Sequence, residues 1–260
     1  MKLQVLVAAV NKEINELAEN MHLQTDAVIV NQCDSYGYQE FFEVENRIQC
    51  FSMAERGVGL NRNTALLHAT GDIVLFSDED ICFYDDYKEK VISAFEKNKD
   101  ADLITFNFKV HESRATYYNT KERRIRWHNY GRYPTFAVAA KLDALRKANV
   151  SFSLLFGGGA KYSNGEDSLF LRDCLKSGMH MYASTEEIGE EVFRKSTWFC
   201  GYNEKFFTDR GVLYHFLYGK LAKPFSLRFL FAHKGEMCKE VSLKQAYRWM
   251  KMGIAEGKLR

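Results

Sequence analysis

The first half of the chain alternates short apolar runs with segments of helical periodicity, and this alternation constrains the fold more than any other feature. The run Leu3–Ala9 is apolar almost throughout, as expected of a strand buried on both faces. Apolar side chains in residues 14–21 then recur at helical spacing. A strand, a helix and another strand in succession favour right-handed crossovers and a parallel arrangement. The sequence therefore predicts an α/β fold of Rossmann-like type, with a mainly parallel sheet flanked by helices.

The alternation of apolar runs and helical segments continues along the chain. We expect further strands at residues 27–30, 48–51, 73–76 and 103–108, and helices at 60–69, 87–95, 167–175 and 242–254. Residues 111–134 are polar and aromatic and are expected to form a long loop or a loose hairpin. Ligands of open α/β sheets bind beyond the carboxyl ends of the strands. That rule singles out residues 10–11, 31–35 and 77–80.

The composition indicates one compact unit with a basic C-terminal extension. There are only two prolines, which leaves no Pro-rich linker, and the net charge of +2 argues against a nucleic-acid partner. Residues 221–260 nevertheless hold nine Lys or Arg and three Glu. We expect a main domain over residues 1–220 and a basic, amphipathic helical extension over 221–260.

The helix expected at 242–254 has an apolar stripe flanked by basic side chains. Two interpretations stay open. The helix packs on the domain with its basic side in water, or it lies on an anionic membrane surface. The second interpretation suggests a lipid-linked acceptor for whatever reaction the chain performs.

Cysteine usage and the termini bear on location. Six cysteines are scattered without a C-x-x-C spacing, which favours a reduced, cytoplasmic chain. The start of the chain does not resemble a signal peptide, and no run of about 20 apolar residues is present. We expect a cytoplasmic protein, with peripheral attachment to the inner face of the membrane as a further expectation.

An acidic cluster follows the strand expected at 73–76. Residues two apart in a strand share a face, so Asp78 and Asp80 can converge on one point. Converging carboxylates favour a cation, and hard oxygen ligands suit Mg²⁺ or Mn²⁺. The alternative is a solvated acidic turn. The position at the ligand-binding edge favours the metal site.

A second acidic pair begins the helix expected at 167–175. Glu166 and Asp167 are typical of helix N-termini, where they cap the helix and complement its dipole. The Gly-rich segment 157–159 shortly before them would let a substrate approach closely. A structural and a catalytic interpretation of the pair therefore stay open at this point.

Taken in order, these motifs resemble the family 2 glycosyltransferases, an inverting group with the GT-A fold that includes many bacterial polysaccharide enzymes. The resemblance spans residues 3–185. It rests on Val10-Asn11, Gln24-Thr25, Gly59–Asn63, Ala69–Asp72, Asp78-Glu79-Asp80, Gly165–Asp167 and Leu171-Arg172.

The resemblance implies a role for each matching residue. Asp80 would bind the metal that bridges the nucleotide diphosphate, and Asp78 would share the metal or contact the ribose. Asp167 would be the general base, with Glu166 beside it in the catalytic pair. Arg62 would help to hold phosphate. Val10, Asn11, Asn31 and Glu79 would complete the donor site, with a UDP-sugar as the expected donor and Mn²⁺ or Mg²⁺ as the cofactor.

The chain departs from the family pattern in two places. The acidic pair and the Gly-Ser usual after the second strand are replaced by Asn31-Gln32-Cys33-Asp34-Ser35, which leaves the base of the donor open. Ala8-Ala9 stands where a proline often ends the first motif. Some relatives use a late His as a metal ligand, and His215 and His233 are candidates by position alone.

The resemblance predicts a metal-dependent hexosyltransferase that moves a sugar from a nucleotide-diphosphate donor to a glycan or lipid-linked glycan in surface polysaccharide synthesis. Two alternatives remain. A sugar nucleotidyltransferase would carry a Gly-rich basic loop after the first strand, where this chain has Ala8–Glu13. A non-catalytic sugar-binding domain would not need Asp78, Asp80 and Asp167.

Overall fold

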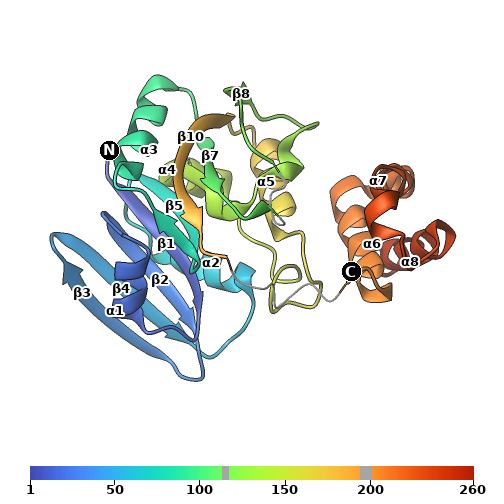
Figure 1. Cartoon of the computed structure of the whole chain (residues 1–260), viewed down its shortest axis with the longest axis horizontal. Coiled ribbons are helices and arrows are strands. Elements are labelled where there is room, and N and C mark those ends of the chain that lie inside the picture. Colours follow the sequence, from blue (N-terminus) through green and yellow to red (C-terminus); the bar gives the residue numbers. More distant parts are fainter. Residues whose placement is uncertain (113–116, 194–200) are drawn as a thin grey trace.

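A computed structural model describes residues 1–112, 117–193 and 201–260, and these form a three-layered α/β body with a helical bundle beside it (Figure 1). The sheet has ten strands, in the order β3-β4-β2-β1-β5-β9-β7-β10-β6, with β8 paired to β10. The strands are β1 (Leu3–Val10), β2 (Asp26–Gln32), β3 (Gly37–Glu43), β4 (Asn46–Met53), β5 (Ile73–Asp78), β6 (Ile81–Phe83), β7 (Leu103–Lys109), β8 (Arg123–Arg124), β9 (Val138–Lys141) and β10 (Met181–Glu191).

Most of the sheet runs in one direction. Strands β4, β2, β1 and β5 are parallel neighbours, and β7 pairs parallel with β10. Between these groups lies the short strand β9, antiparallel to both β5 and β7. Strands β3, β6 and β8 are also antiparallel to their neighbours. The sheet is therefore mixed, but its six principal strands share one carboxyl edge.

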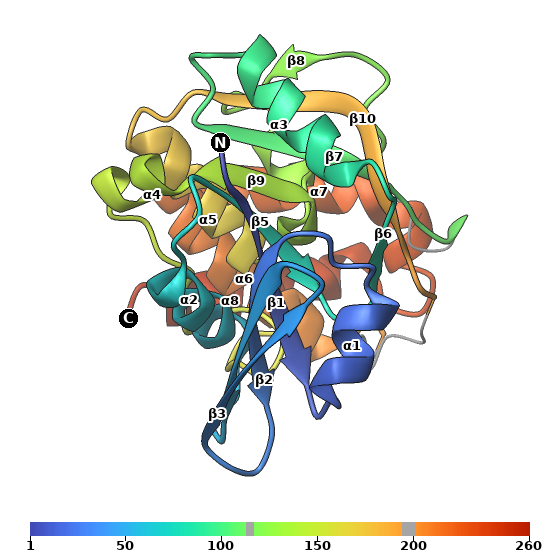
Figure 2. The ribbon, with the colours of Figure 1, turned by 90° about the vertical axis from the view of Figure 1, so that its left-hand side faces the viewer.

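Helices cover both faces of the sheet (Figure 2). They are α1 (Ile14–Asn20), α2 (Val58–His68), α3 (Tyr87–Lys97), α4 (Leu142–Ala148) and α5 (Glu166–Lys176). One apolar core joins α1 and α3 to the face that carries Val5 and Val7 of β1. A second core joins α2, α4 and α5 to the face that carries Leu6. Alternate residues of β1 thus enter different cores, which explains why the run is apolar throughout.

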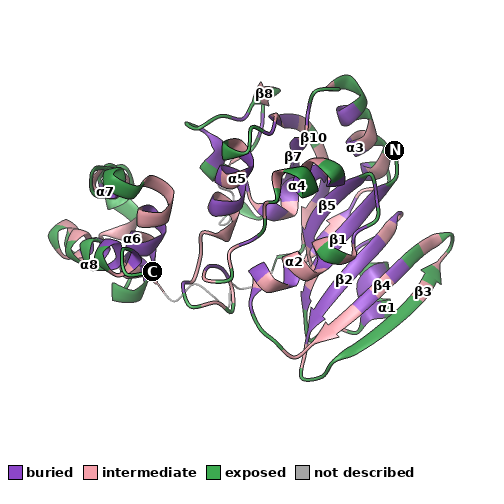
Figure 3. Cartoon of the chain, turned by 180° about the vertical axis from the view of Figure 1, so that it is seen from behind, coloured by how far each residue is buried: buried purple, intermediate pink, exposed green. Residues whose placement is uncertain are grey.

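The remaining helices form a bundle with its own core. These are α6 (Glu204–Tyr218), α7 (Ala222–Met237) and α8 (Leu243–Gly257). Phe156, Tyr162 and Leu169 of the main body belong to the same core, so the bundle packs against the segment that leads into α5. Figure 3 shows buried residues on the bundle's inner side and exposed residues on its outer side.

The strands and helices expected from the sequence are all present, with ends that differ by a few residues. The bundle of α6–α8 begins at Glu204, ahead of the boundary expected at residue 221, and the division into two domains stays a prediction. The segment expected to be a loop or hairpin at 111–134 contains β8 and a short 3₁₀ helix, Tyr130–Arg132, among its described residues. Cys200 lies outside the described residues. In the part of the chain that the structure describes, no helix has the length and apolarity needed to cross a bilayer.

Candidate functional site

A buried arginine gathers three carboxylates at the carboxyl edge of the sheet. Arg62 projects from α2 with only 6% of its side chain exposed. Its guanidinium lies 2.9 Å from Asp78 Oδ1, 3.3 Å from Glu166 Oε1 and 3.2 Å from Asp167 Oδ1. Asp78 and Asp167 are 89 positions apart in the chain, and Arg62 connects them directly. We call these four residues the Arg62 cluster.

Local structure explains how the carboxylates reach the guanidinium. Asp78 is the last residue of β5, at the carboxyl end of a buried strand. Glu166 and Asp167 form the first turn of α5, where the helix dipole favours negative charge. Gly165 precedes them with φ at +114°, and a Cβ atom there would lie 2.5 Å from a methyl carbon of Leu213. The turn into α5 therefore depends on glycine and on contact with the bundle.

The charges in the cluster are strongly coupled. Burial lowers the pKa of Arg62, but the three carboxylates outweigh that effect and raise it above its usual value. Burial raises the pKa of Glu166 to about 7, and the charge of Asp167 adds to the rise while Arg62 opposes it. The guanidinium is therefore charged, and burial favours the protonated form of Glu166.

Two further residues position the acidic pair. The hydroxyl of Thr135 donates a hydrogen bond to Asp167 Oδ1, the atom that also accepts from Arg62. Gly157 packs against Glu166, since a Cβ atom at Gly157 would lie 2.8 Å from the Glu166 carboxyl carbon. The aromatic ring of Phe152 covers the Arg62 guanidinium, with its centroid 5.5 Å from the guanidinium carbon. Polar and aromatic contacts thus hold these groups on several sides.

Residues at the ends of β1 and β2 form a second connected group. Glu79 accepts a hydrogen bond of 2.6 Å from the Val10 amide, and it forms an ion pair with Lys12 Nζ at 3.2 Å. Asn31 accepts from the Lys12 amide and donates to the Lys12 carbonyl. Asn11 has a positive φ of 52° and donates its amide to the Gln32 carbonyl. These bonds fix the loop after β1 and use both polar atoms of the Asn31 side chain.

Asp80 lies in the turn between β5 and β6, and its carbonyl accepts a hydrogen bond from Val192. In residues 1–112, 117–193 and 201–260, no three His, Cys, Asp or Glu side chains come together as a metal site. Mg²⁺ and Mn²⁺ are commonly held by one or two carboxylates with substrate phosphates and water. Strand β5 ends at Asp78 and residues 79–80 form a turn, so Asp78 and Asp80 do not share a strand face as the sequence led us to expect. Their carboxylate oxygens are still ligands of the type that Mg²⁺ and Mn²⁺ take, and the metal site stays a prediction. His215 and His233 lie in the bundle, on α6 and α7.

The structure thus places most of the residues expected from the sequence in two groups, and Asp80 lies outside both in the turn after β5. Asp78, Arg62, Glu166 and Asp167 meet in one, and Val10, Glu79 and Asn31 meet in the other. Arg62 faces carboxylates rather than solvent. Thr135, Lys12 and Phe152 were not expected. Their contacts join segments far apart in the sequence, and no sequence motif predicts them.

Part of the chain matches the model of a known protein family. The family described as glycosyl transferase family 2 matches residues 6–150, more than half of the chain. That range contains Arg62 and Asp78 but ends before α5. No significant match was found among curated protein sequences.

Solved structures with the same fold include S. aureus TarS and a mannosyltransferase. The crystal structure of S. aureus TarS 1-349 in complex with UDP-GlcNAc has a TM-score of 0.64 and 16% identity, covering 97% of this chain and 79% of that one. The mannosyltransferase PcManGT from Pyrobaculum calidifontis, in complex with GDP-Man and Mn²⁺, has a TM-score of 0.53 and 13% identity, covering 99% and 75%. The predicted fold, α/β of GT-A type with C-terminal helices, is confirmed.

Proposed function

The chain belongs to glycosyl transferase family 2, and from that premise we propose that it transfers a sugar from a nucleotide-diphosphate sugar to an acceptor hydroxyl. The observation that carries the proposal is the Arg62 cluster. One guanidinium holds the acid at the end of β5 and the acid at the start of α5 in a single site. A donor-side carboxylate and a base on the acceptor side are what such a transfer needs within one site.

Asp167 is the proposed general base. As the acceptor oxygen attacks the anomeric carbon, Asp167 takes the hydroxyl proton, a new C–O bond forms, and the bond to the diphosphate breaks. A single displacement of this kind inverts the anomeric configuration. Thr135 and Arg62 both bond Oδ1 of Asp167. They therefore fix the carboxylate's orientation and leave Oδ2 for the acceptor, which is the arrangement a base requires.

Asp80 and Asp78 are the proposed ligands of Mn²⁺ or Mg²⁺, which when bound neutralises the leaving diphosphate as a Lewis acid. Glu79 holds the loop after β1 through the Val10 amide and Lys12. The amides of Val10 and Asn11 are used within the protein, so the loop would meet the donor through the exposed side chains of these two residues. UDP-GlcNAc and GDP-Man, the ligands named for the TarS and PcManGT structures, support a nucleotide sugar as donor, and UDP-sugars are the first to test.

The reaction is tested with the full chain, Mn²⁺ and a panel of nucleotide sugars, with released nucleoside diphosphate as the readout. We expect diphosphate release with one donor, and none from Asp167→Asn. Release of pyrophosphate would identify a nucleotidyltransferase and overturn the proposal. Binding of a sugar without turnover of any donor, across acceptors that include lipid-linked glycans, would favour a non-catalytic module.

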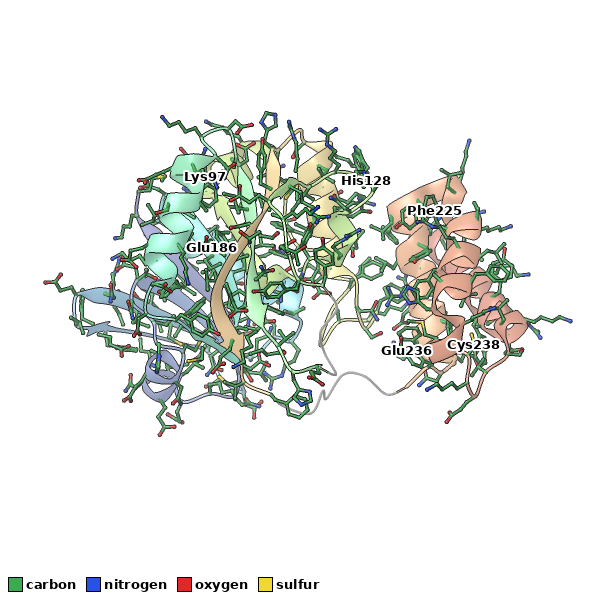
Figure 4. The ribbon with its side chains drawn as sticks, turned by 45° about the horizontal axis from the view of Figure 1, so that its top comes forward. Lys97, His128, Glu186, Phe225, Glu236 and Cys238 are labelled. Carbon is green, nitrogen blue, oxygen red and sulfur yellow. The ribbon has the colours of Figure 1, made fainter. Side chains whose placement is uncertain are left out.

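The outward side of α7 supports a membrane-borne acceptor. We define the α7 outer face as Lys223, Pro224, Leu227, Arg228, Phe231 and Lys234. Its apolar members are spaced at i, i+3 and i+7, so they form one ridge, and Phe231 is 58% exposed. Glu236, the one acid of α7, accepts a hydrogen bond from Tyr202 instead of joining this face. Phe225 and Glu236 lie near opposite ends of the helix (Figure 4).

A ridge of apolar residues flanked by lysine and arginine suits the interface of an anionic bilayer. We propose that the α7 outer face lies on such a surface and that the acceptor is a lipid-linked glycan. The apolar stripe of the helix expected at 242–254 packs into the core of the bundle through Met250 and Ile254, so the proposed membrane contact moves from that helix to α7. The basic charge excess of residues 221–260 supports this arrangement.

A further inference from the structure

Two arginines and two tyrosines gather beside β8, outside the Arg62 cluster. The guanidinium carbons of Arg132 and Arg123 lie 4.6 and 5.9 Å from the ring centroid of Tyr117. The ring of Tyr133 packs edge-on against Tyr117, with 5.7 Å between centroids. We call these four residues the Tyr117 cluster. The strand β8 that carries Arg123 lies above α5 in the view of Figure 1.

The Tyr117 cluster contains buried polar atoms without partners. Tyr133 is only 5% exposed, and among the described residues nothing bonds its hydroxyl. The same holds for Nε of Arg123. Within those residues, neither Arg123 nor Arg132 forms an ion pair with a carboxylate. An unpaired buried polar group costs about 1–3 kcal/mol, so a ligand that bonds these atoms would be favoured.

The chemistry of these groups defines that ligand. Burial raises the pKa of Tyr133, while Arg132 and Arg123 oppose the rise. The hydroxyl is therefore protonated at neutral pH and can donate a hydrogen bond. Arginine donates only, so the cluster offers donors and two positive charges. Guanidinium groups match the geometry of phosphate oxygens, and an oxyanion can accept from each of these kinds of donor.

The position of the cluster relates it to the acceptor side. Tyr133 precedes Thr135 by two residues, and the Thr135 hydroxyl bonds Asp167. The Cα atoms of Tyr133 and Thr135 are therefore at most about 7 Å apart. The donor diphosphate is proposed to lie at Asp80, in the turn after β5, and Asp80 is not a member of the Tyr117 cluster.

We propose that the Tyr117 cluster binds a phosphate group of the acceptor, so that the enzyme acts on a phosphate-bearing glycan or lipid. The existence of the anion site is independent of the proposed function, whereas its assignment to the acceptor rests on that function. The hydroxyl of Tyr133 and the two guanidinium groups hold the phosphate, which keeps the acceptor chain beside Asp167.

The site is tested by titrating the full chain with inorganic phosphate and with dimethyl phosphate at constant ionic strength, by calorimetry. We expect both ligands to bind the wild type. Tyr133→Phe should weaken binding at least fivefold without lowering the melting temperature, because the lost hydroxyl has no partner. Arg123→Gln with Arg132→Gln should abolish saturable binding. Arg126→Gln, an exposed arginine of the same segment, should bind as the wild type does.

Each contrary result has a defined meaning. Equal affinity in the wild type and Tyr133→Phe, together with equal affinity in the double arginine variant, would overturn the site. Binding of inorganic phosphate alone would overturn its assignment to an esterified phosphate of the acceptor. Displacement of dimethyl phosphate by UDP with Mn²⁺ would place the anion in the donor site and overturn the proposal. Since no sugar transfer is measured, failure of the proposed transferase activity cannot produce any of these results.

Discussion

The guanidinium of Arg62 donates a hydrogen bond to Asp167 over 3.2 Å, and this contact ties the start of α5 to the end of β5. The same guanidinium lies 2.9 Å from Asp78. Arg62 therefore acts as a positioning residue. It sets the distance between the proposed base and the proposed donor-side carboxylate, and its charge keeps the buried acids compatible with the fold.

Replacing Arg62 with methionine should destabilise the protein in a pH-dependent way. Three carboxylates would lose their counter-charge, and breaking a buried ion pair costs about 3–5 kcal/mol. Protonation of the carboxylates at low pH relieves their repulsion. We therefore expect a large loss of unfolding free energy at pH 8 and a smaller loss at pH 5, measured by urea denaturation.

The matched control is Arg172→Met. Arg172 is also buried, but it pairs with Asp173 alone among the carboxylates of the described residues. The decrease in unfolding free energy caused by Arg172→Met should therefore depend less on pH. A penalty for Arg62→Met that stayed constant between pH 5 and pH 8 would contradict the role assigned to Arg62.

Asp167→Asn should abolish transfer and spare donor binding. Asparagine keeps the hydrogen bond from Thr135 but cannot take the acceptor proton, and a positioned general base contributes about 10²–10⁴-fold to the rate. We expect kcat to fall by that factor while the Kd for UDP with Mn²⁺ changes less than twofold in calorimetry. Asp173→Asn, on the same helix, is the control and should retain full activity. Comparable kcat values in Asp167→Asn and the wild type would exclude Asp167 as the base.

Much of the main body is predictable from the sequence because its strands are buried on both faces. The run from Leu3 to Val10 is apolar at nearly every position, and an apolar run of that length has few other solutions. By contrast, β9 has four residues, and only its insertion between β5 and β7 makes it a strand. Strand β10 contains four glutamates, a residue type depleted in strands, and its register shifts twice.

The bundle and the contacts of the site are harder to predict from the sequence. Helix α6 has apolar side chains all round because the main body, α7 and α8 surround it, so it lacks the one-sided pattern of a surface helix. Arg62 was expected to hold phosphate, but its carboxylate partners on α5 lie 104 and 105 residues away. Asn31 was expected in the donor site, and its amide is occupied by the Lys12 backbone. Only the folded chain shows such pairings.

Glu166 should make stability depend on pH. Its pKa is raised from 4.5 to about 7 in the folded protein, so the folded state binds a proton that the unfolded state has lost. This contribution is complete below pH 4.5 and disappears as pH rises through about 7, at up to about 1.4 kcal/mol per pH unit. Relative to Glu166→Gln, the unfolding free energy of the wild type should fall between pH 5 and pH 8.

The control is Glu186→Gln, at an exposed glutamate of β10 (Figure 4). Glu186→Gln should change the unfolding free energy little, and by the same amount at every pH between 5 and 8. A constant difference between the wild type and Glu166→Gln from pH 5 to pH 8 would show that Glu166 titrates normally.

Gly157→Ala should disturb the acidic pair directly. The new Cβ atom would lie 2.8 Å from the carboxyl carbon of Glu166 and 2.5 Å from a methyl carbon of Val58, at a residue whose φ is +103°. We expect a loss of about 1–3 kcal/mol from strain and a fall in kcat as Glu166 shifts. Gly178→Ala has a similar positive φ of +85° but no neighbour within 4 Å. Gly178→Ala should lower stability but leave kcat unchanged. Equal losses of kcat in both variants would show that the contact between residue 157 and Glu166 does not matter for catalysis.

The α7 outer face should bind anionic vesicles. Each Lys or Arg at a membrane surface contributes about 1 kcal/mol, so Lys223, Arg228 and Lys234 together should favour vesicles with 30 mol% phosphatidylglycerol over neutral ones by about two orders of magnitude in partition coefficient. Phe231→Gln should reduce flotation by removing the centre of the ridge. Phe42→Gln is a matched control, because Phe42 is 66% exposed but lies on β3 beside Glu43. If Phe231→Gln and Phe42→Gln floated equally well, the membrane would contact another surface, because the apolar ridge of α7 is the feature that distinguishes this face.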